Sequence, residues 1–341
     1  MRGLICPAPG ALELTDTLPE PGAPPPGWAL LQVEQVGICG TDYHIYEGKH
    51  PFLTYPRVMG HEIAATVLVP GDGVTLAAGT AVIVNPYLSC GTCLACRNGK
   101  PNCCARIEVL GVHRDGAMCE RILVPAGNLY PAGDLGLTGA AAVEFLAIGA
   151  HAVRRSLAPA GVRALVIGAG PIGLGAAIFA RIAGHRVTLL DTEPERLAFA
   201  RDRLGLAQGI VGGPDLAEQV AARTGGEGFD VVFDATGNAA SMRGAIAHVA
   251  QGGALVYVGV VRDEIAFPHP EFHRREMMLI ASRNAVRADF DHVAESLRAG
   301  RVPLDALVTH RLTLDEAVTA LPRLARTKAG LIKAVIRIGR A

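Results

Sequence analysis

Two short segments carry the residues with the clearest capacity for chemistry. Residues 37–44 contain a thiol, a hydroxyl and an imidazole, and residues 59–62 contain an imidazole followed by a carboxylate: Cys39, Thr41, His44, His61 and Glu62. Thiolate and imidazole are the ligands that a borderline-soft ion such as zinc prefers, and a neighbouring carboxylate could join or leave the ion. The hydroxyl and second imidazole would suit removal of a proton from an alcohol held there. Taken alone, Cys39 or His61 is better explained as a buried thiol or a loop histidine.

A cluster of cysteines supplies the most specific local pattern. The chain has eight cysteines, and four of them have the spacing C-x2-C-x2-C-x7-C on a loop with glycine and proline: Cys90, Cys93, Cys96 and Cys104. Four thiolates can surround one zinc ion tetrahedrally and leave no position open, so this site is predicted to be structural. The alternatives are unrelated buried or disulfide-bonded cysteines, and Cys103 in place of Cys104.

Two further segments contain possible site residues. Residues 138–154 are apolar and helix-forming apart from one carboxylate, Glu144. A lone glutamate among such residues is costly to bury unless it is paired or bound to metal, so Glu144 is a candidate third ligand; an exposed helix face is the alternative. The polar turn 111–116 carries His113 and Arg114, which could grip a substrate or belong to a solvated loop.

A glycine-rich loop between a strand and a helix predicts a dinucleotide site. The apolar strand from Arg163 leads into Gly168-x-Gly170-x-x-Gly173, and a helix-forming stretch covers residues 174–183. The first glycine permits a tight turn, the second lets a pyrophosphate approach the backbone, and the third lets helix pack on strand. The helix N-terminus then offers a positive dipole to the phosphates.

Asp191 ends the next strand, residues 186–191. It would accept hydrogen bonds from both ribose hydroxyls of adenosine and repel a 2′-phosphate, so we expect NAD rather than NADP; an ordinary helix N-cap is the alternative. Other strand ends, where a doubly wound sheet binds its ligand, lie near residues 236 and 259. The residues predicted to bind the cofactor are Gly168, Gly170, Pro171, Ile172, Gly173, Asp191, Arg196, Thr236, Gly259 and Arg283.

The pattern of elements changes along the chain. Short strands separated by glycine and proline turns, at 28–36, 66–69 and 80–85, indicate a small β-barrel. Strands then alternate with helices, at 163–167, 186–191, 229–234, 253–259 and 277–282, which is typical of a doubly wound parallel sheet. From about residue 286 we expect two helices and a final strand, 331–338, that returns to the first domain.

Composition excludes several classes of protein. The 341 residues suffice for about two domains. Lys+Arg and Asp+Glu both number 32, so no charge excess marks a nucleic-acid or anionic-membrane surface. No apolar run approaches the roughly 18 residues of a membrane span, and the N-terminus lacks a signal-peptide pattern. We therefore predict a cytoplasmic protein without nucleic-acid or membrane partners.

Taken in order, the cysteine–histidine site, the cysteine cluster and the nucleotide fold resemble the zinc-dependent medium-chain dehydrogenase/reductase family over essentially the whole chain. The resemblance implies an α/β protein with a GroES-like β-barrel catalytic domain and a Rossmann doubly wound parallel-sheet domain. The implied boundaries are 1–146 for the catalytic domain, with its cysteine lobe at about 86–106, 147–285 for the NAD-binding domain, and 286–341 for the returning segment.

The family also implies a catalytic and a structural zinc ion, with NAD as cofactor. The segments at Cys39 and His61 match its catalytic-zinc motifs, and Glu144 matches the third ligand of its sorbitol and threonine dehydrogenase branch. Glu62 would bind the catalytic zinc transiently, and Asp42 would be the partner of His61.

In the proton relay that the family implies, Thr41 takes the hydroxyl proton and His44 passes it to solvent through the cofactor ribose, while hydride moves to the nicotinamide. Stretches at 55–61, 109–116, 270–276 and 282–285 resemble bacterial hexonate dehydrogenases of the L-galactonate or L-gluconate 5-dehydrogenase kind. The implied substrate is a sugar acid, and the residues expected to contact it are His113, Arg114, Arg283 and Asn284.

Three other functions fit parts of the pattern. A polyol or L-threonine 3-dehydrogenase would use the same zinc, and a dinucleotide-binding sensor or scaffold would lack turnover. A zinc-independent quinone reductase would need neither zinc site, which conflicts with the ligands present. By analogy with the family we expect a homo-oligomer, with a tetramer favoured over a dimer.

Overall fold

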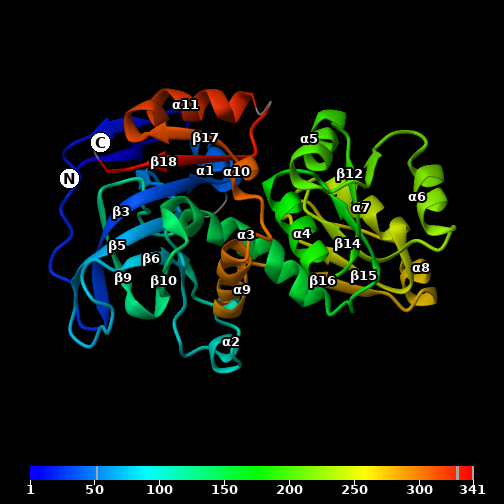
Figure 1. The fold of residues 1–341 in the computed structure, drawn as a ribbon, viewed down its shortest axis with the longest axis horizontal. Helices are drawn as coiled ribbons and strands as arrows, with labels where there is room; N and C mark the ends of the chain where they lie inside the picture. The colour runs from blue at the N-terminus through cyan, green and yellow to red at the C-terminus, as the bar shows by residue number, and fades with distance from the viewer. Residues whose placement is uncertain (51–52, 328–329, 340–341) are drawn as a thin grey trace. The chain divides into compact units, whose positions relative to one another are not determined.

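The computed structural model describes residues 1–50, 53–327 and 330–339. The chain divides into two compact units (Figure 1). Unit 1 comprises Met1–Glu144, Ala294–Ala299 and Leu307–Ala341, and unit 2 comprises Phe145–Val293 and Gly300–Ala306. The segment from residue 286 onward is therefore shared between the two units.

Unit 1 is built on a seven-stranded sheet with the order β10-β6-β5-β3-β18-β17, in which β9 also pairs with β3. These pairs are antiparallel, apart from β17 with β18. Along β3 buried residues such as Leu31 and Val33 alternate with partly exposed ones, as expected of a strand with one face on a core. The strands are β3 (Trp28–Ile38), β5 (Glu62–Pro70), β6 (Ala81–Val84), β9 (Arg121–Pro125), β10 (Leu129–Pro131), β17 (Val308–Thr313) and β18 (Lys333–Arg337).

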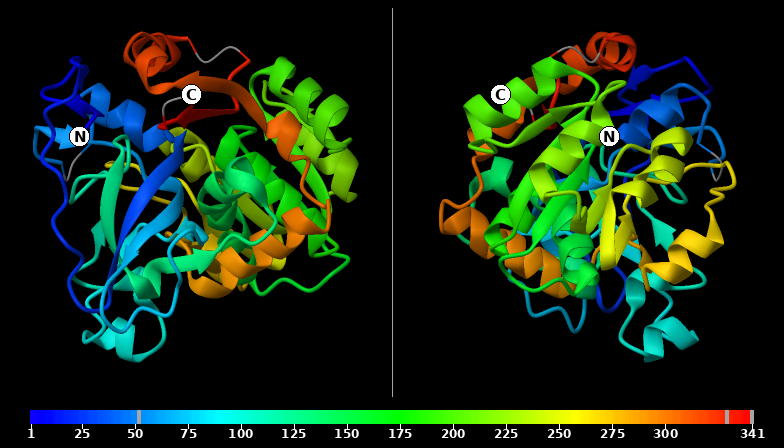
Figure 2. Two further views of the ribbon diagram at one scale, coloured as in Figure 1. Left: turned by 60° about the vertical axis from the view of Figure 1, so that its left-hand side comes forward. Right: turned by 90° about the vertical axis from the view of Figure 1, so that its right-hand side faces the viewer.

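Smaller elements complete unit 1. A three-stranded sheet contains β1 (Gly3–Cys6), β2 (Glu13–Thr15) and β4 (Arg57–Val58), and a two-stranded sheet contains β7 (Tyr87–Leu88) and β8 (Glu108–Val109). The helices are α1 (Gly40–Tyr46), α2 (Leu94–Arg97), η1 (Pro101–Cys103), η2 (Ala126–Asn128) and α11 (Leu314–Arg326). The loop with α2, in cyan, projects away from the seven-stranded sheet (Figures 1 and 2).

Unit 2 is a six-stranded, all-parallel sheet with the order β13-β12-β11-β14-β15-β16. This is the Rossmann order, which reverses direction between β11 and β14, and helices cover the sheet (Figure 2). The strands are β11 (Arg163–Ile167), β12 (Arg186–Asp191), β13 (Gly209–Val211), β14 (Phe229–Asp234), β15 (Val249–Tyr257) and β16 (Met278–Ala281). The helices are α4 (Pro171–Ile182), α5 (Pro194–Leu204), α6 (Leu216–Thr224), α7 (Ala239–Gly244), η3 (Ala245–His248) and α8 (His269–Arg274).

Three helices contain residues of both units: α3 (Gly136–Ser156), α9 (Arg287–Arg298) and α10 (Leu304–Leu307). By length and composition α3 could cross a membrane, but 78% of its most apolar window is buried inside the protein. Such burial is typical of a core helix. It agrees with the prediction that residues 138–154 form an apolar helix.

The doubly wound parallel sheet expected from the sequence is confirmed, whereas the expectation of two helices and one strand after residue 286 was wrong. That segment contains α9, α10 and α11 and two strands, because β17 precedes α11 and pairs with β18. The sequence reasoning also missed α1, a short helix whose start depends on a cap formed by Asp42.

Candidate metal and dinucleotide sites

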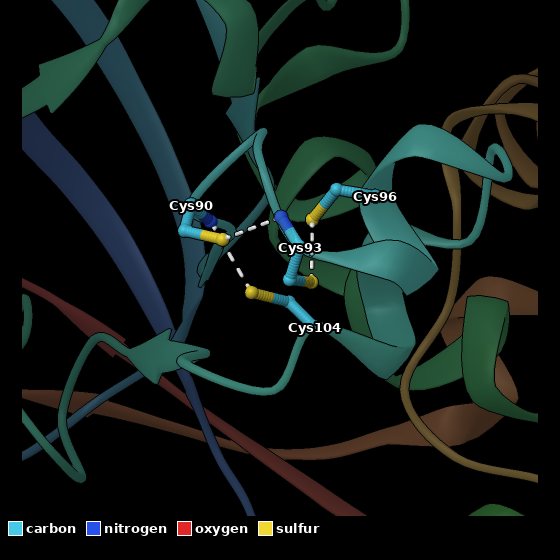
Figure 3. Close-up of side chains that lie close together, drawn as sticks. All are labelled: Cys90, Cys93, Cys96 and Cys104. Carbon is cyan, nitrogen blue, oxygen red and sulfur yellow. Dashed lines mark hydrogen bonds between the residues drawn. The ribbon is translucent and has the colours of Figure 1, made fainter.

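The four cysteines of the predicted lobe meet at one point (Figure 3). The sulfur atoms of Cys90, Cys93, Cys96 and Cys104 all lie within 4.8 Å of one another. Of the two neighbouring candidates, Cys104 joins the group and is buried, whereas Cys103 is exposed at the end of η1. The tight loop forms because Cys93 starts α2 and left-handed Gly91 and Gly99 reverse the chain beside it.

Backbone N–H groups point at these sulfur atoms. The Cys90 sulfur accepts from the backbone N–H of Cys93 at 3.4 Å, and the Cys104 sulfur accepts from Arg106 at 3.4 Å. Hydrogen bonds from the backbone and hydroxyl of Thr92 lower the pKa of Cys90 to about 5, whereas burial raises the pKa of Cys96 to about 11. Donors of this kind stabilise thiolates, the form in which cysteine binds zinc.

A second group forms where β3 ends and β5 begins. The register pairs Gly37 with Glu62, so Cys39, just past β3, comes beside His61, just before β5. Ligand atoms of Cys39, His61 and Glu62 lie within 4.8 Å of one another, and both His61 and Glu62 are buried. The predicted cysteine–histidine pair is therefore brought together by strand register.

Asp42 holds the backbone around this group and lies within ion-pair distance of His61, its predicted partner. Its carboxylate accepts hydrogen bonds from the backbone N–H of Cys39 at 2.8 Å and of Gly60 at 3.2 Å. The first of these bonds caps α1. The His61 Nδ1 atom lies 3.9 Å from Asp42, beyond hydrogen-bond distance. Burial opposes protonation of His61, but the negative charges of Cys39 and Asp42 raise its pKa well above the usual range.

Glu62 is paired with a lysine that the sequence reasoning missed. Lys333, on β18, donates to Glu62 Oε1 at 2.6 Å and to the backbone oxygen of Ile38 at 3.1 Å, and all three atoms are buried in unit 1. Burial disfavours the charged amine, but the charge of Glu62 outweighs it and raises the pKa of Lys333. A single lysine within the apolar stretch 331–338 was the available signal.

Glu144 is buried on α3, where the hydroxyl of Tyr87 donates a hydrogen bond to its Oε1. Burial raises the pKa of Glu144 to about 7, against the opposing charge of His61. Its oxygens do not belong to the group within 4.8 Å, so its role as third ligand stays a prediction. Tyr87 was not singled out in the sequence, since nothing in its local pattern marks it.

The donor set fits a zinc ion. A thiol, an imidazole and a carboxylate converge, and two of their polar atoms, His61 Nδ1 and Glu62 Oε2, are buried with no hydrogen-bond partner among the described residues. Buried polar atoms without partners are rare and costly unless an ion or water completes them. This group differs from the four-cysteine lobe in offering three ligands of different kinds, where the lobe offers four thiols.

Thr41 and His44 both lie on α1. The Thr41 hydroxyl is 3.8 Å from the Cys39 sulfur, which places it beside the metal group. His44, three residues further along the helix, is exposed. One turn of helix therefore separates a half-buried hydroxyl at the site from an imidazole in solvent.

The glycine-rich loop of unit 2 has the geometry that its sequence predicts. Gly168 has a left-handed φ of 96°, and a side chain at Gly173 would lie 1.7 Å from the Gly168 oxygen, so both positions require glycine. Gly170 is the N-cap of α4, followed by Pro171 at its first turn. Helix α4 therefore begins just after the end of β11. The backbone N–H groups of its first turn have no partner within the helix, and a phosphate would bind there.

Asp191 ends β12 and lies against that loop. Its carboxylate accepts hydrogen bonds from the backbone N–H of Ala169 at 2.6 Å and of Glu193 at 2.9 Å. The N-cap of α5 is Glu193, so the simple N-cap interpretation of Asp191 does not apply. Arg196 lies on the first turn of α5. One of its guanidinium nitrogens is 3.7 Å from the position that a Cβ atom would occupy at Gly170, so the side chain lies close to the glycine-rich loop.

The other predicted cofactor residues lie at neighbouring strand ends of the same sheet. The Thr236 hydroxyl donates to buried Asp234 at 2.6 Å, and the Gly259 N–H donates to the Asp234 backbone oxygen at 3.1 Å. Ile172 lies in the first turn of α4. These residues surround the end of β14, next to β11, where the strand order reverses.

The predicted substrate contacts fall in different units. In unit 1, His113 Nδ1 accepts from the Val109 N–H at 3.1 Å, and Arg114 pairs with Glu108 at 3.4 Å and stacks 5.7 Å from the Trp28 ring. The turn that carries them bonds through its backbone to the segment before His61. In unit 2, Arg283 is exposed and Asn284 has a left-handed φ of 53°.

Two family models, several curated relatives and several solved structures match this chain. The family described as "Alcohol dehydrogenase GroES-like domain" matches residues 25–134, and "Zinc-binding dehydrogenase" matches residues 171–299. An L-galactonate-5-dehydrogenase of Escherichia coli strain K12 is 40% identical over 338 residues, with 98% of each chain covered. A D-altritol 5-dehydrogenase of Agrobacterium fabrum is 36% identical over 300 residues, covering 86% of this chain and 87% of the relative. The crystal structure of a short chain alcohol dehydrogenase from Escherichia coli CFT073, complexed with NADH, matches with a TM-score of 0.92, 27% identity and 99% of each chain covered.

This chain belongs to the zinc-binding alcohol dehydrogenase family. It is an α/β oxidoreductase with a GroES-like domain and a Rossmann-like sheet, and its cofactors are zinc and a nicotinamide dinucleotide. The predicted family, fold class and enzyme class are thereby confirmed.

Proposed function

We propose that this protein oxidises a secondary hydroxyl of a sugar acid, a hexonate such as L-galactonate or L-gluconate, to the 5-keto acid, and transfers the hydride to NAD. The observation that carries the substrate class is the 40% identity to an L-galactonate-5-dehydrogenase across 98% of both chains. The grouping of Cys39, His61 and Glu62 supports the zinc chemistry.

Cys39, His61 and Glu144 hold the catalytic zinc in this proposal, and Glu62 exchanges onto it. The bound ion supplies Lewis-acid chemistry that lowers the pKa of the substrate hydroxyl. Asp42 keeps the Cys39 and Gly60 backbone in place, so the two strongest ligands are fixed by one buried carboxylate. The cysteines of the lobe hold a structural zinc.

Thr41 accepts the substrate hydroxyl proton, and His44 passes it to solvent. Two observations support this relay: the Thr41 hydroxyl lies 3.8 Å from the Cys39 sulfur, and His44 is exposed to solvent. His44 needs no burial for this role, because an imidazole in contact with solvent can exchange protons with water.

NAD binds unit 2 with its pyrophosphate at the start of α4 and its adenosine ribose at Asp191. The Asp191 carboxylate already accepts two backbone N–H bonds, and its remaining lone pairs can accept ribose hydroxyls. Asp191→Ala should therefore weaken the binding of NAD more than the binding of NADP. The ratio of kcat/KM with NAD to kcat/KM with NADP should fall by about tenfold or more. An unchanged preference in steady-state assays with both cofactors would contradict this role.

For the substrate carboxylate, the candidates are Arg283, Arg114 and His113, because arginine offers a carboxylate a bidentate fork. Arg114 also contacts Glu108 and the Trp28 ring. An Arg283→Met variant should raise KM for a hexonate far more than KM for a polyol, because only the hexonate carries a charge to lose.

The decisive assay is NADH formation by zinc-loaded protein across a panel of L-galactonate, L-gluconate, D-gluconate, L-idonate, sorbitol, galactitol and L-threonine. Activity confined to one or two hexonates is the expected result. Activity on polyols alone would replace the substrate class and favour the second candidate, a polyol dehydrogenase, which the 36% identity to a D-altritol 5-dehydrogenase supports. Silence with zinc bound would overturn both.

The protein also acts, in this proposal, as a cytoplasmic homo-oligomer. All eight cysteines are free thiols, as expected in a reducing compartment. The edge strand β16 exposes Met278 and Leu279, 48% and 41% accessible, and an exposed apolar edge invites pairing with another strand. Leu279→Lys should lower the mass measured by light scattering during size-exclusion chromatography; an unchanged mass would argue against this edge.

A further inference from the structure

Lys333 is the most unusual charged residue outside the predicted machinery. Within the described parts of the chain it is the only buried lysine or arginine, at 2% exposure. It comes from β18, which lies beside β3 in the sheet of unit 1 (Figure 1). The register pairs Ala334 with Ile38, so the amine is delivered to the turn that carries Cys39. Neither family match extends as far as residue 333.

The two oxygens of Glu62 are in different situations. Oε1 accepts the charge-assisted bond from Lys333 at 2.6 Å. Oε2 has no hydrogen-bond partner among the described residues, and it packs so closely on Gly37 that an added side chain there would lie 1.9 Å away. One oxygen is thus fixed by a cation and the other is not, and the Glu62 carboxylate lies within 4.8 Å of the ligand atoms of Cys39 and His61.

The ion pair between Lys333 and Glu62 lies among several acidic groups. Three buried carboxyl groups, those of Asp42, Glu62 and Glu144, surround the metal group together with the Cys39 thiol. A divalent ion does not neutralise all of these groups when they are ionised. Lys333 adds a positive charge in direct contact with Glu62, and a buried charge without such a partner is strongly unfavourable.

From these contacts we infer that Lys333 is a positioning residue that keeps Glu62 beside the catalytic zinc without letting it become a permanent ligand. The inference rests on the proposed zinc site. The amine competes with the metal for the Glu62 carboxylate, so a ligand position stays open for the substrate hydroxyl. The second bond, to the Ile38 oxygen at 3.1 Å, fixes the amine to the backbone that precedes Cys39.

The inference predicts opposite changes in zinc affinity and in turnover. In Lys333→Met the Glu62 carboxylate loses its competing cation and binds the metal more strongly, and one repelling positive charge disappears. The catalytic zinc should then be retained about tenfold more tightly, an effect of the size typical for groups that contact metal ligands, while kcat falls because the open position is occupied. A merely structural lysine would do the reverse and loosen the zinc.

The experiment measures zinc retained per chain by the full-length, zinc-loaded protein against increasing concentrations of a competing chelator. Cys39→Ser identifies the release step that belongs to the catalytic site. Lys333→Met should need about tenfold more chelator for half-release, and Lys333→Arg, the control that keeps the charge, should stay within about threefold of the wild type. Release of the Lys333→Met zinc at the same or a lower chelator concentration would overturn the inference.

The double variant Glu62→Gln/Lys333→Met provides a second test that leaves no buried charge unpaired, should the single variant fail to fold. Because Lys333 acts through Glu62, this variant should release zinc at the same chelator concentration as Glu62→Gln alone. A clear difference between them would overturn the inference. Wild-type protein that holds zinc only in the cysteine lobe would overturn the proposed zinc enzyme as well, whereas zinc at both sites with no tightening would overturn only the role of Lys333.

Discussion

The two candidate metal centres of unit 1 are built in contrasting ways. The lobe takes four identical ligands from one short loop, Cys90 to Cys104, and leaves three of them half-exposed. The other centre brings together the Cys39 thiol, the His61 imidazole and the Glu62 carboxylate where β3 ends and β5 begins, and His61 and Glu62 are buried. A closed set of strong ligands serves stability, whereas a mixed and incompletely satisfied set leaves room for a reactant.

The largest expected effect comes from removing a ligand of the buried centre. Cys39→Ser should lower kcat/KM by about a thousandfold or more, because Lewis-acid stabilisation of several kcal/mol is lost. The fold should persist, since the segment is also held by Asp42. Steady-state rates measure the loss of activity, and circular dichroism measures whether the fold persists. Substantial remaining activity would count against Cys39 as a ligand of the catalytic zinc.

The neighbouring cysteines of the lobe offer a matched pair. Cys104→Ser should remove the structural zinc and lower the melting temperature by roughly 10 °C, as expected for the loss of a few kcal/mol of metal-coupled stability. Cys103→Ser should change neither, since Cys103 is exposed and outside the sulfur group. Thermal unfolding with zinc analysis measures both, and equal effects of the two variants would refute the assignment of Cys104.

Thr41 tests whether the buried centre performs proton transfer. Thr41→Val should lower kcat by about a hundredfold, which is the usual contribution of a positioned proton acceptor. The zinc content should not change. Thr41→Ser keeps the hydroxyl and should retain most of the activity. A valine variant with full turnover would remove Thr41 from the relay.

Tyr87 tests the smallest of these contributions, the support around Glu144. Tyr87→Phe deletes the hydroxyl that bonds to Glu144 Oε1 and should weaken zinc binding at the buried centre by about tenfold. The sulfur atoms of the lobe are held by backbone N–H groups and the Thr92 hydroxyl, so the lobe should keep its zinc. Chelator competition distinguishes the sites, and an unchanged release curve would show that Glu144 needs no support from Tyr87.

The same contrast explains what could be predicted from the sequence. The lobe and the glycine-rich loop depend on spacing within one segment, so Cys104 and Gly173 were identified correctly as members of their groups. Lys333 was missed because its partner Glu62 is 271 residues away in the chain. The hydrogen bonds that Asp42 accepts from the backbone, in addition to its ion pair with His61, depend on the capped start of α1, which sequence spacing does not reveal.

The most direct test of the account is the zinc content per chain of the wild type, Cys39→Ser and Cys104→Ser, measured together with NADH formation on L-galactonate. The account predicts one zinc at each centre in the wild type and loss of a different one in each variant. Loss at the buried centre should abolish turnover in a stable protein, and loss at the lobe should chiefly destabilise the fold. Full zinc content and full activity in Cys39→Ser would contradict the assignment of the catalytic centre.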